Sequence, residues 1–167
     1  MLRLRSHRKP SRGQALVEFA LIIPLFVLLL FGIVDFGRAV LASNSIANAA
    51  REGARTAIVN QRVSDIRDRV IDQATGVALA NSDVRIAYRD SSNPNNVTNL
   101  CRNSSGAAAP RVGCVAVVTV RTVYQAATPV IGGIVGTICM HSTTMMPIEA
   151  VPTPLPPPPP AWTAPCP

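Results

Sequence analysis

Histidines and metal-binding motifs are scarce in this sequence. His7 and His141 are the two histidines, and none of the four cysteines stands in Cys-x-x-Cys spacing. A structural zinc site needs four clustered cysteine or histidine ligands, so we expect no such site. Asp65, Asp68 and Asp72 share helical spacing, but no glycine-centred calcium loop surrounds them and arginines stand between them. We therefore expect no bound metal.

Motifs for catalysis are lacking as well. Beyond residues 1–13, His141 is the only imidazole, and no recognisable serine or cysteine motif surrounds it. The sequence contains neither Gly-x-x-x-x-Gly-Lys nor Gly-x-Gly-x-x-Gly, the patterns that bind phosphates. We expect no cofactor and no enzymatic activity, and we interpret His141 as a surface residue of a strand.

Acidic residues are few, and the basic excess is concentrated at one end. The chain has 16 Lys and Arg against nine Asp and Glu, a net charge of +7. Residues 1–13 contain no acid and five basic residues, namely Arg3, Arg5, Arg8, Lys9 and Arg12. Positive residues beside a membrane helix stay in the cytoplasm, so this basicity indicates membrane topology. We expect no nucleic-acid partner.

The feature that dominates the chain is the apolar run over residues 15–34, interrupted only by Glu18. As a helix this run is about 30 Å long, the thickness of a bilayer's hydrocarbon core. It is apolar on every face, unlike a soluble amphipathic helix. It also exceeds the about 7–15 residues of a signal-peptide core. We predict a retained membrane helix over 14–35, in contact with membrane lipid, after a basic cytoplasmic leader over 1–13.

Glu18 has two interpretations, because an ionisable group inside a membrane is costly. It either lies at the level of the lipid headgroups and marks the helix start, or it awaits a positive partner. Cleavage after Gly13 would supply one, the new α-amino group of Gln14 on a neighbouring subunit. Pro24 lies inside the predicted helix, where it removes one backbone hydrogen bond.

The remainder predicts an α+β fold, with the long helix continuing into an exported helix packed on a small antiparallel sheet. We expect helices over 36–59 and 63–74, strands near 83–89, 114–124 and 139–149, and a long loop over 90–113. The exported head then spans 36–150, and residues 151–167 form a proline-rich tail that we expect to be disordered.

Two apolar surfaces of the head each have two interpretations. Small residues recur on one face of the exported helix from Ala39 to Ala57, and this face packs either on the protein's own sheet or on another subunit. The connector over 126–138 is apolar but contains one proline and several glycines. It is either a hairpin tip folded onto the core or an exposed patch that touches membrane or partner.

The four cysteines lie on the predicted exported side, where disulfides persist. Cys101–Cys114 is the most economical pair, because it would staple the long loop to the main strand and stabilise the head by about 3 kcal/mol. Cys166 then pairs with Cys139, pairs between molecules, or stays free. The sequence does not choose among these connectivities.

Several motifs of the N-terminal region are similar to those of a known family. Residues 12–20 read Arg-Gly-Gln-Ala-Leu-Val-Glu-Phe-Ala, residues 23–24 Ile-Pro, residues 36–38 Phe-Gly-Arg, and residues 49–55 Ala-Ala-Arg-Glu-Gly-Ala-Arg. Together they resemble the TadE-like family, pseudopilin-type minor components of the tight-adherence (Flp-type) pilus machinery. The resemblance is dense over 12–59 and looser to residue 149.

The resemblance implies a prepilin-peptidase site. Gly13 would be the last leader residue, Gln14 the new N-terminus and Glu18 the fifth residue of the mature chain. It also implies a pilin-like head, a location in the bacterial inner membrane, and three kinds of partner: a prepilin peptidase, other pilin or pseudopilin subunits, and the pilus assembly machinery.

The sequence leaves three hypotheses for the function of this chain. The first is a non-enzymatic pseudopilin-like subunit of pilus biogenesis, whose helix inserts among pilin helices. The second is an uncleaved single-pass membrane anchor whose loop over 90–113 binds an extracellular partner. The third, a membrane-tethered enzyme, conflicts with the lack of an acid/base set. Processing between Gly13 and Gln14 separates the first from the second.

Overall fold

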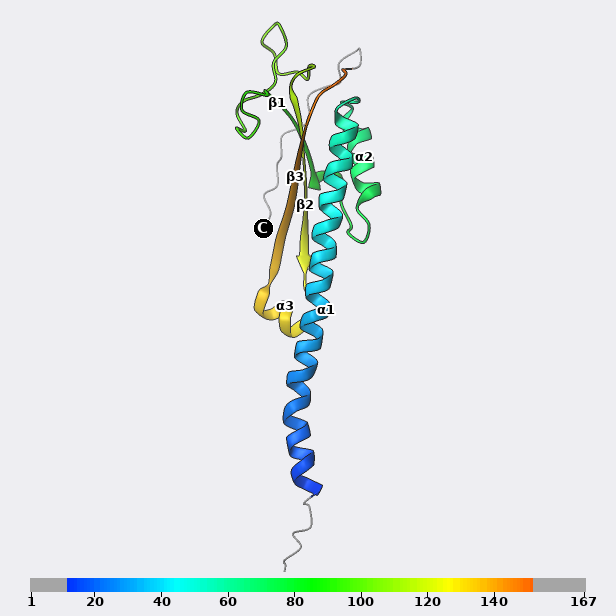
Figure 1. Cartoon of the computed structure of the whole chain (residues 1–167), viewed down its shortest axis with the longest axis vertical. Helices are drawn as coiled ribbons and strands as arrows, with labels where there is room; N and C mark the ends of the chain where they lie inside the picture. Colours follow the sequence, from blue (N-terminus) through cyan, green and yellow to red (C-terminus); the bar gives the residue numbers. More distant parts are fainter. Residues whose placement is uncertain (1–11, 152–167) are drawn as a thin grey trace, which may run out of the picture.

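The computed structural model describes residues 12–151. A single long helix, α1 (Arg12–Ala57), runs through the molecule, and the other elements gather around its C-terminal half (Figure 1). The N-terminal half of α1 extends beyond them. The predicted α+β class is confirmed: a long apolar helix is joined to a small antiparallel sheet. The expected leader and tail lie largely outside the described residues.

The continuity of α1 follows from its composition. Its 46 residues continue through Pro24 and through the boundary expected near residue 35. The second helix, α2 (Val63–Gln73), buries Ile66 and Val70 and exposes most of its charged residues. Its periodic apolar face therefore predicted both its position and its orientation.

Three strands form one sheet in the order β1-β2-β3, all antiparallel. They are β1 (Val84–Arg89), β2 (Val115–Gln125) and β3 (Thr137–Pro147), with the short 3-10 turn η1 (Asn81–Asp83) leading into β1. All 11 residues of β2 pair with β3, and Val118 stands between Ile86 and Thr144. The long β2–β3 hairpin therefore extends from the top of the head towards the N-terminal half of α1 (Figure 1).

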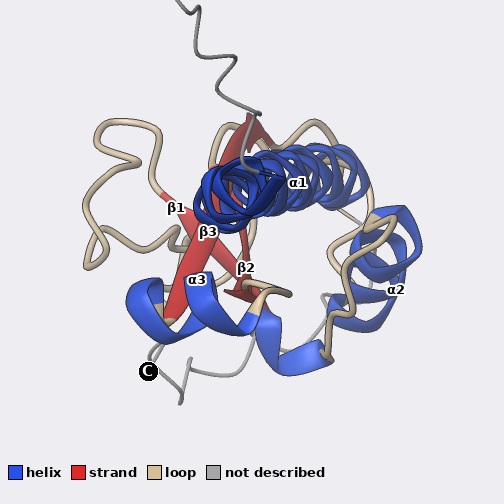
Figure 2. Cartoon of the chain, turned by 90° about the horizontal axis from the view of Figure 1, so that it is seen from below, coloured by secondary structure: helices blue, strands red, loops and turns tan. Residues whose placement is uncertain are grey.

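The core lies between this sheet and the C-terminal part of α1. Ala116, Val118 and Val120 alternate along β2 and are fully buried, as the two-residue period of a strand requires. Ala50 and Ala54 of α1 are fully buried with them in one cluster. The view along α1 shows α2 and the strands on different sides of this helix (Figure 2). The small-residue face over 46–57 thus packs on the protein's own sheet and on α2.

A buried amide ties the end of α1 to the end of the sheet. Gln61 is fully buried, and its Nε2 donates to the carbonyls of Ala57 at 2.9 Å and Ala150 at 2.8 Å. Tyr88 donates its hydroxyl to the carbonyl of Gln61 at 3.3 Å, and burial raises the pKa of this phenol. The N–H groups of Glu149 and Ala150 also donate to the carbonyl of Ile58, just after α1. These bonds fix the upper end of the head.

The connector over 126–138, in which the sequence did not predict a helix, has regular structure. It contains a short helix, α3 (Pro129–Val135), which begins with a proline in its first turn and ends before Gly136 at φ 67°. Pro and Gly here mark the two ends of a helix, a use for which each residue is well suited. The connector forms the tip of the β2–β3 hairpin beside α1 (Figures 1 and 2).

Candidate functional site

The N-terminal half of α1 carries an apolar surface with no cover from the rest of the chain. Every large apolar side chain between residues 16 and 36 is exposed. The most apolar 18-residue window has a mean hydropathy of 2.8 and none of it is buried. This helix, Gly13–Ala57, is long and apolar enough to cross a membrane. Such exposure is typical of a helix that contacts lipid or other helices, because large apolar patches are rare on soluble monomers.

The residues predicted for processing and pairing all lie on this surface. Gly13 and Gln14 occupy the first turn of α1, and a side chain at Gly13 would have nothing within 4 Å. Glu18 lies one turn further along, exposed, and makes no ion pair with residues 12–151. Pro24 is exposed in the middle of the run. The geometry places Gln14 and Glu18 four residues apart, on one face of the helix.

Asp35 of α1 is a buried acid whose contacts no pattern in the sequence indicates. It is 4% exposed and stands where the free apolar half of α1 meets the head. Its carboxylate accepts the N–H groups of Ala127 at 3.0 Å and Thr128 at 3.2 Å, and the Thr128 hydroxyl. Tyr124 donates its hydroxyl to the Asp35 carbonyl at 2.7 Å. Thr128 is the N-cap of α3, so Asp35 holds the start of α3 against α1.

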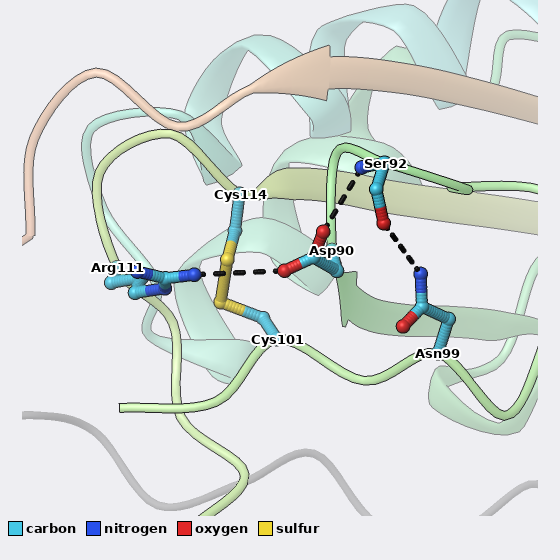
Figure 3. The surroundings of a disulfide bond; sticks show 6 residues. All are labelled: Asp90, Ser92, Asn99, Cys101, Arg111 and Cys114. Carbon is cyan, nitrogen blue, oxygen red and sulfur yellow. Dashed lines mark hydrogen bonds and ion pairs between the residues drawn. A yellow bond between two sulfur atoms is a disulfide. The ribbon is translucent and has the colours of Figure 1, made fainter. Parts of the chain in front are cut away.

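The loop over 90–113 is held by the disulfide predicted from the sequence. Cys101 and Cys114 are bonded, with Cα atoms 5.9 Å apart, and both are buried. Figure 3 shows the bond beside an ion pair between Arg111 and Asp90 at 3.5 Å. Asp90 also accepts the N–H of Ser92 at 3.0 Å, and chiefly this bond holds the pKa of Asp90 below its usual range. The loop is therefore stapled at its base.

The two remaining cysteines are only partly described. Cys139 in β3 also takes part in a disulfide. Cys166, one of its candidate partners from the sequence, lies outside the described residues. The connectivity of this second bridge stays a prediction.

The residues considered for metal binding and catalysis do not form a site. Asp65 is engaged by Asn60 Nδ2 at 2.7 Å and Ser64 Oγ at 3.0 Å, and these bonds lower its pKa. Within residues 12–151, no group of three or more potential metal ligands is found. His141 is exposed in β3 opposite Arg121, as expected for a surface strand residue.

One of the open grooves on the head lies between α1, residues 73–78 and the end of β2. Its volume is about 780 Å³, and Arg38, Ser45, Gln73 and Tyr124 are among its lining residues. Arg38 is the one ionisable group in that lining apart from the Tyr124 phenol, which donates to the Asp35 carbonyl. This lining pairs no acid with a base, so it does not assemble a set for acid–base catalysis.

Comparison with known proteins supports the N-terminal motifs. The sequence profile of the family described as TadE-like protein matches residues 13–55. No curated protein and no solved structure matches the chain. The match covers the apolar half of α1, the Asp35 junction and most of the helix that packs on the sheet. The family is one of structural components of the Tad pilus, and the match suggests that this chain takes part in the Tad pilus machinery. The resemblance recognised in the sequence is thus confirmed for residues 13–55, which match the model of the TadE-like family.

Proposed function

We propose that this chain is a non-enzymatic, pseudopilin-like subunit of tight-adherence pilus biogenesis. The observation that carries the proposal is α1 itself. One continuous helix presents a fully exposed apolar half and a half that forms the spine of a small head, and the TadE-like match covers both. In this proposal the exposed half lies in the inner membrane and packs among pilin helices, while the head is exported.

Processing by a prepilin peptidase fits the position of the predicted cleavage site. The bond between Gly13 and Gln14 lies in the first turn of α1. The first four N–H groups of a helix have no partner within it, so this end opens at little cost to reach a peptidase. Gly13 has no side chain, is exposed, and has no other group within 4 Å of the place where a Cβ would stand. Removal of residues 1–13 then leaves Gln14 with a new, charged α-amino group.

The new α-amino group of Gln14 is the positive partner that Glu18 would pair with. A carboxylate with only lipid or apolar helices around it is strongly disfavoured. A neighbouring subunit whose Gln14 ammonium reaches Glu18 neutralises both charges, and buried charges persist when they are paired. Glu18 is exposed and forms no ion pair with another residue of the described chain. Its carboxylate is therefore available to such a neighbour.

The head has the properties of an exported domain. Its disulfide between Cys101 and Cys114 suits an oxidising compartment. Export of the C-terminal part agrees with the basic residues before α1, which favour a cytoplasmic N-terminus. The proposal therefore describes a single-pass protein of the inner membrane with its head outside.

The test is Glu18→Gln, read out twice in the same cells. We expect leader removal to proceed, because the cut bond is several residues upstream, while crosslinking to partner pilins is lost. An unpaired amine in the assembly costs a few kcal/mol, and roughly 1.4 kcal/mol is already a tenfold change in an equilibrium. Intact mass reports processing, and crosslinking reports assembly.

Glu52→Gln is the matched control. Glu52 is the other glutamate of α1, within the head, where its ion pair with Arg55 at 3.7 Å is partly exposed and contributes little. Both readouts should stay normal in this variant. Normal crosslinking in Glu18→Gln would reject the pairing. If Glu18→Gln lost both crosslinking and cleavage, the peptidase itself would be shown to recognise Glu18.

A further inference from the structure

We propose that α3, at the tip of the β2–β3 hairpin, is a foot of the head that rests in the outer lipid interface of the membrane crossed by α1. The occupant of its exposed apolar surface is lipid, at the boundary between headgroups and acyl chains. This inference rests on the membrane insertion of α1 proposed above, and goes beyond it by assigning a second membrane contact to the head.

The first observation is the level of α3 along α1. A Cβ built on Gly32 would lie 3.9 Å from Cδ1 of Ile131, so α3 touches α1 at that residue. Gly32 is within the apolar run over 15–34, near its outer end. Asp35 fixes the same level through its bonds to Ala127 and Thr128. Any bilayer that accommodates the run up to residue 34 therefore reaches α3 (Figure 1).

The second observation is the surface that α3 presents. Ile134 is 81% exposed and Val135 51%, and Ile138 just beyond them is also exposed. From residue 122 to residue 140 the chain carries no Asp, Glu, Lys or Arg. A water-facing hairpin tip normally carries polar turn residues, whereas interfacial segments pair a polar attachment with exposed Leu, Ile or aromatic groups.

The backbone of α3 suits an interfacial position. Gly132 N–H donates to Thr128 O at 2.8 Å and Gly136 N–H to Gly132 O at 2.9 Å, and Asp35 accepts the N–H groups before the helix. Backbone groups near hydrocarbon must be satisfied within the protein, and here the chain supplies the partners. Tyr124, with its hydroxyl bound to the Asp35 carbonyl, adds the kind of aromatic group that is enriched at this depth.

The foot has a consequence for the head. With α1 alone as anchor, the head would be free to tilt about the outer end of the membrane helix. Contact of α3 with the same leaflet adds a second point of support, one hairpin length away from the loop over 90–113 (Figure 1). The head then stands upright on the membrane, with that loop directed away from it.

The test uses tryptophan fluorescence in nanodiscs that hold one copy of the full chain, in lipids brominated near the headgroup end of the acyl chains. Trp162 is first replaced by phenylalanine. Ile134→Trp is the probe, and Val135→Trp repeats the measurement at a second exposed position. Leu25→Trp in the middle of the apolar run reports insertion of α1, and Val97→Trp, exposed in the loop over 90–113, reports a site away from lipid.

We expect bromolipid to quench Ile134→Trp, Val135→Trp and Leu25→Trp, with no loss of fluorescence from Val97→Trp. Quenching of Leu25→Trp alone would overturn the lipid foot and leave the membrane insertion of α1 intact. An unquenched Leu25→Trp would overturn both. Thermal unfolding of each variant checks that the head is folded, and the single copy per disc excludes contacts with a neighbouring subunit.

Discussion

Gly53 of α1 lies against both α2 and β2. A Cβ at this position would stand 2.3 Å from Cγ2 of Val70 and 3.1 Å from Cγ1 of Val118. Both valines are fully buried and β-branched, so neither can turn its methyl groups aside freely. Glycine is therefore required here by the spacing of the elements.

We predict that Gly53→Ala destabilises the head by about 1–3 kcal/mol, the usual cost of overpacking a well-filled core. Gly37→Ala is the control, because its added methyl group meets nothing within 4 Å and alanine favours a helix by up to about 1 kcal/mol. Urea unfolding in detergent, followed by the near-ultraviolet signal of the head, measures both. Equal stability of the two variants would contradict this packing.

Asp35 is the residue that attaches the hairpin tip to α1. Asparagine has the same shape but only one acceptor oxygen in place of two. In Asp35→Asn, an N–H of Ala127 or Thr128 loses its acceptor and faces an amide NH₂ group. A buried donor without a partner costs about 1–3 kcal/mol.

We therefore expect faster hydrogen exchange at residues 127–135 in Asp35→Asn, while residues 115–120 of β2 keep their protection. Asp72→Asn, at an exposed acid of α2, should leave both regions unchanged. Uniform acceleration over the whole head would show that Asp35 supports global folding rather than the attachment of α3.

At the scale of elements, the periodic spacing of apolar residues predicted the regular helices and strands. The apolar patterns predicted the positions of α2, β1 and β2. The Cys101–Cys114 disulfide was predicted because it closes the long loop onto the main strand. The helix α3 was missed because its proline and glycines resemble breakers. Asp35 was missed because its partners lie more than 90 residues away, and no local pattern in the sequence indicates that contact. The roles of Gly13, Gln14 and Glu18 depend on other proteins and stay predictions.

The loop over 90–113 is held by one disulfide, by hydrogen bonds within the loop and to Tyr88 and Ile148, and by the ion pair of Asp90 with Arg111. We predict that the double variant Cys101→Ser, Cys114→Ser loosens this loop and costs about 3 kcal/mol of head stability. Limited proteolysis should cut within the loop. The helicity of α1 should stay unchanged, because no disulfide joins the loop to α1. Resistance to proteolysis equal to that of the native chain would mean that contacts such as Asp90 with Arg111 hold the loop alone.

At the scale of the whole molecule, α1 has an exposed apolar half, long and apolar enough to cross a membrane, and a second half that carries the head. The core at residues 46–57 and the bonds of Gln61 rigidly join the head to the C-terminal half. The Asp35 contacts carry the hairpin down to the outer end of the apolar run. One unbroken helix therefore joins the exposed apolar half to the head. This is the organisation expected of a subunit that assembles through its helix.

The central claim is that this helix enters an assembly as a processed subunit, and the mature N-terminus tests it most directly. The full chain is produced with its cognate prepilin peptidase, and intact-mass measurement follows purification. We predict loss of residues 1–13 and a chain that begins at Gln14. Gly13→Ala, which keeps a small residue, should still be cut, and Gly13→Leu should retain the leader. An unchanged mass of the native chain would contradict the account and favour the uncleaved membrane-anchored binding module.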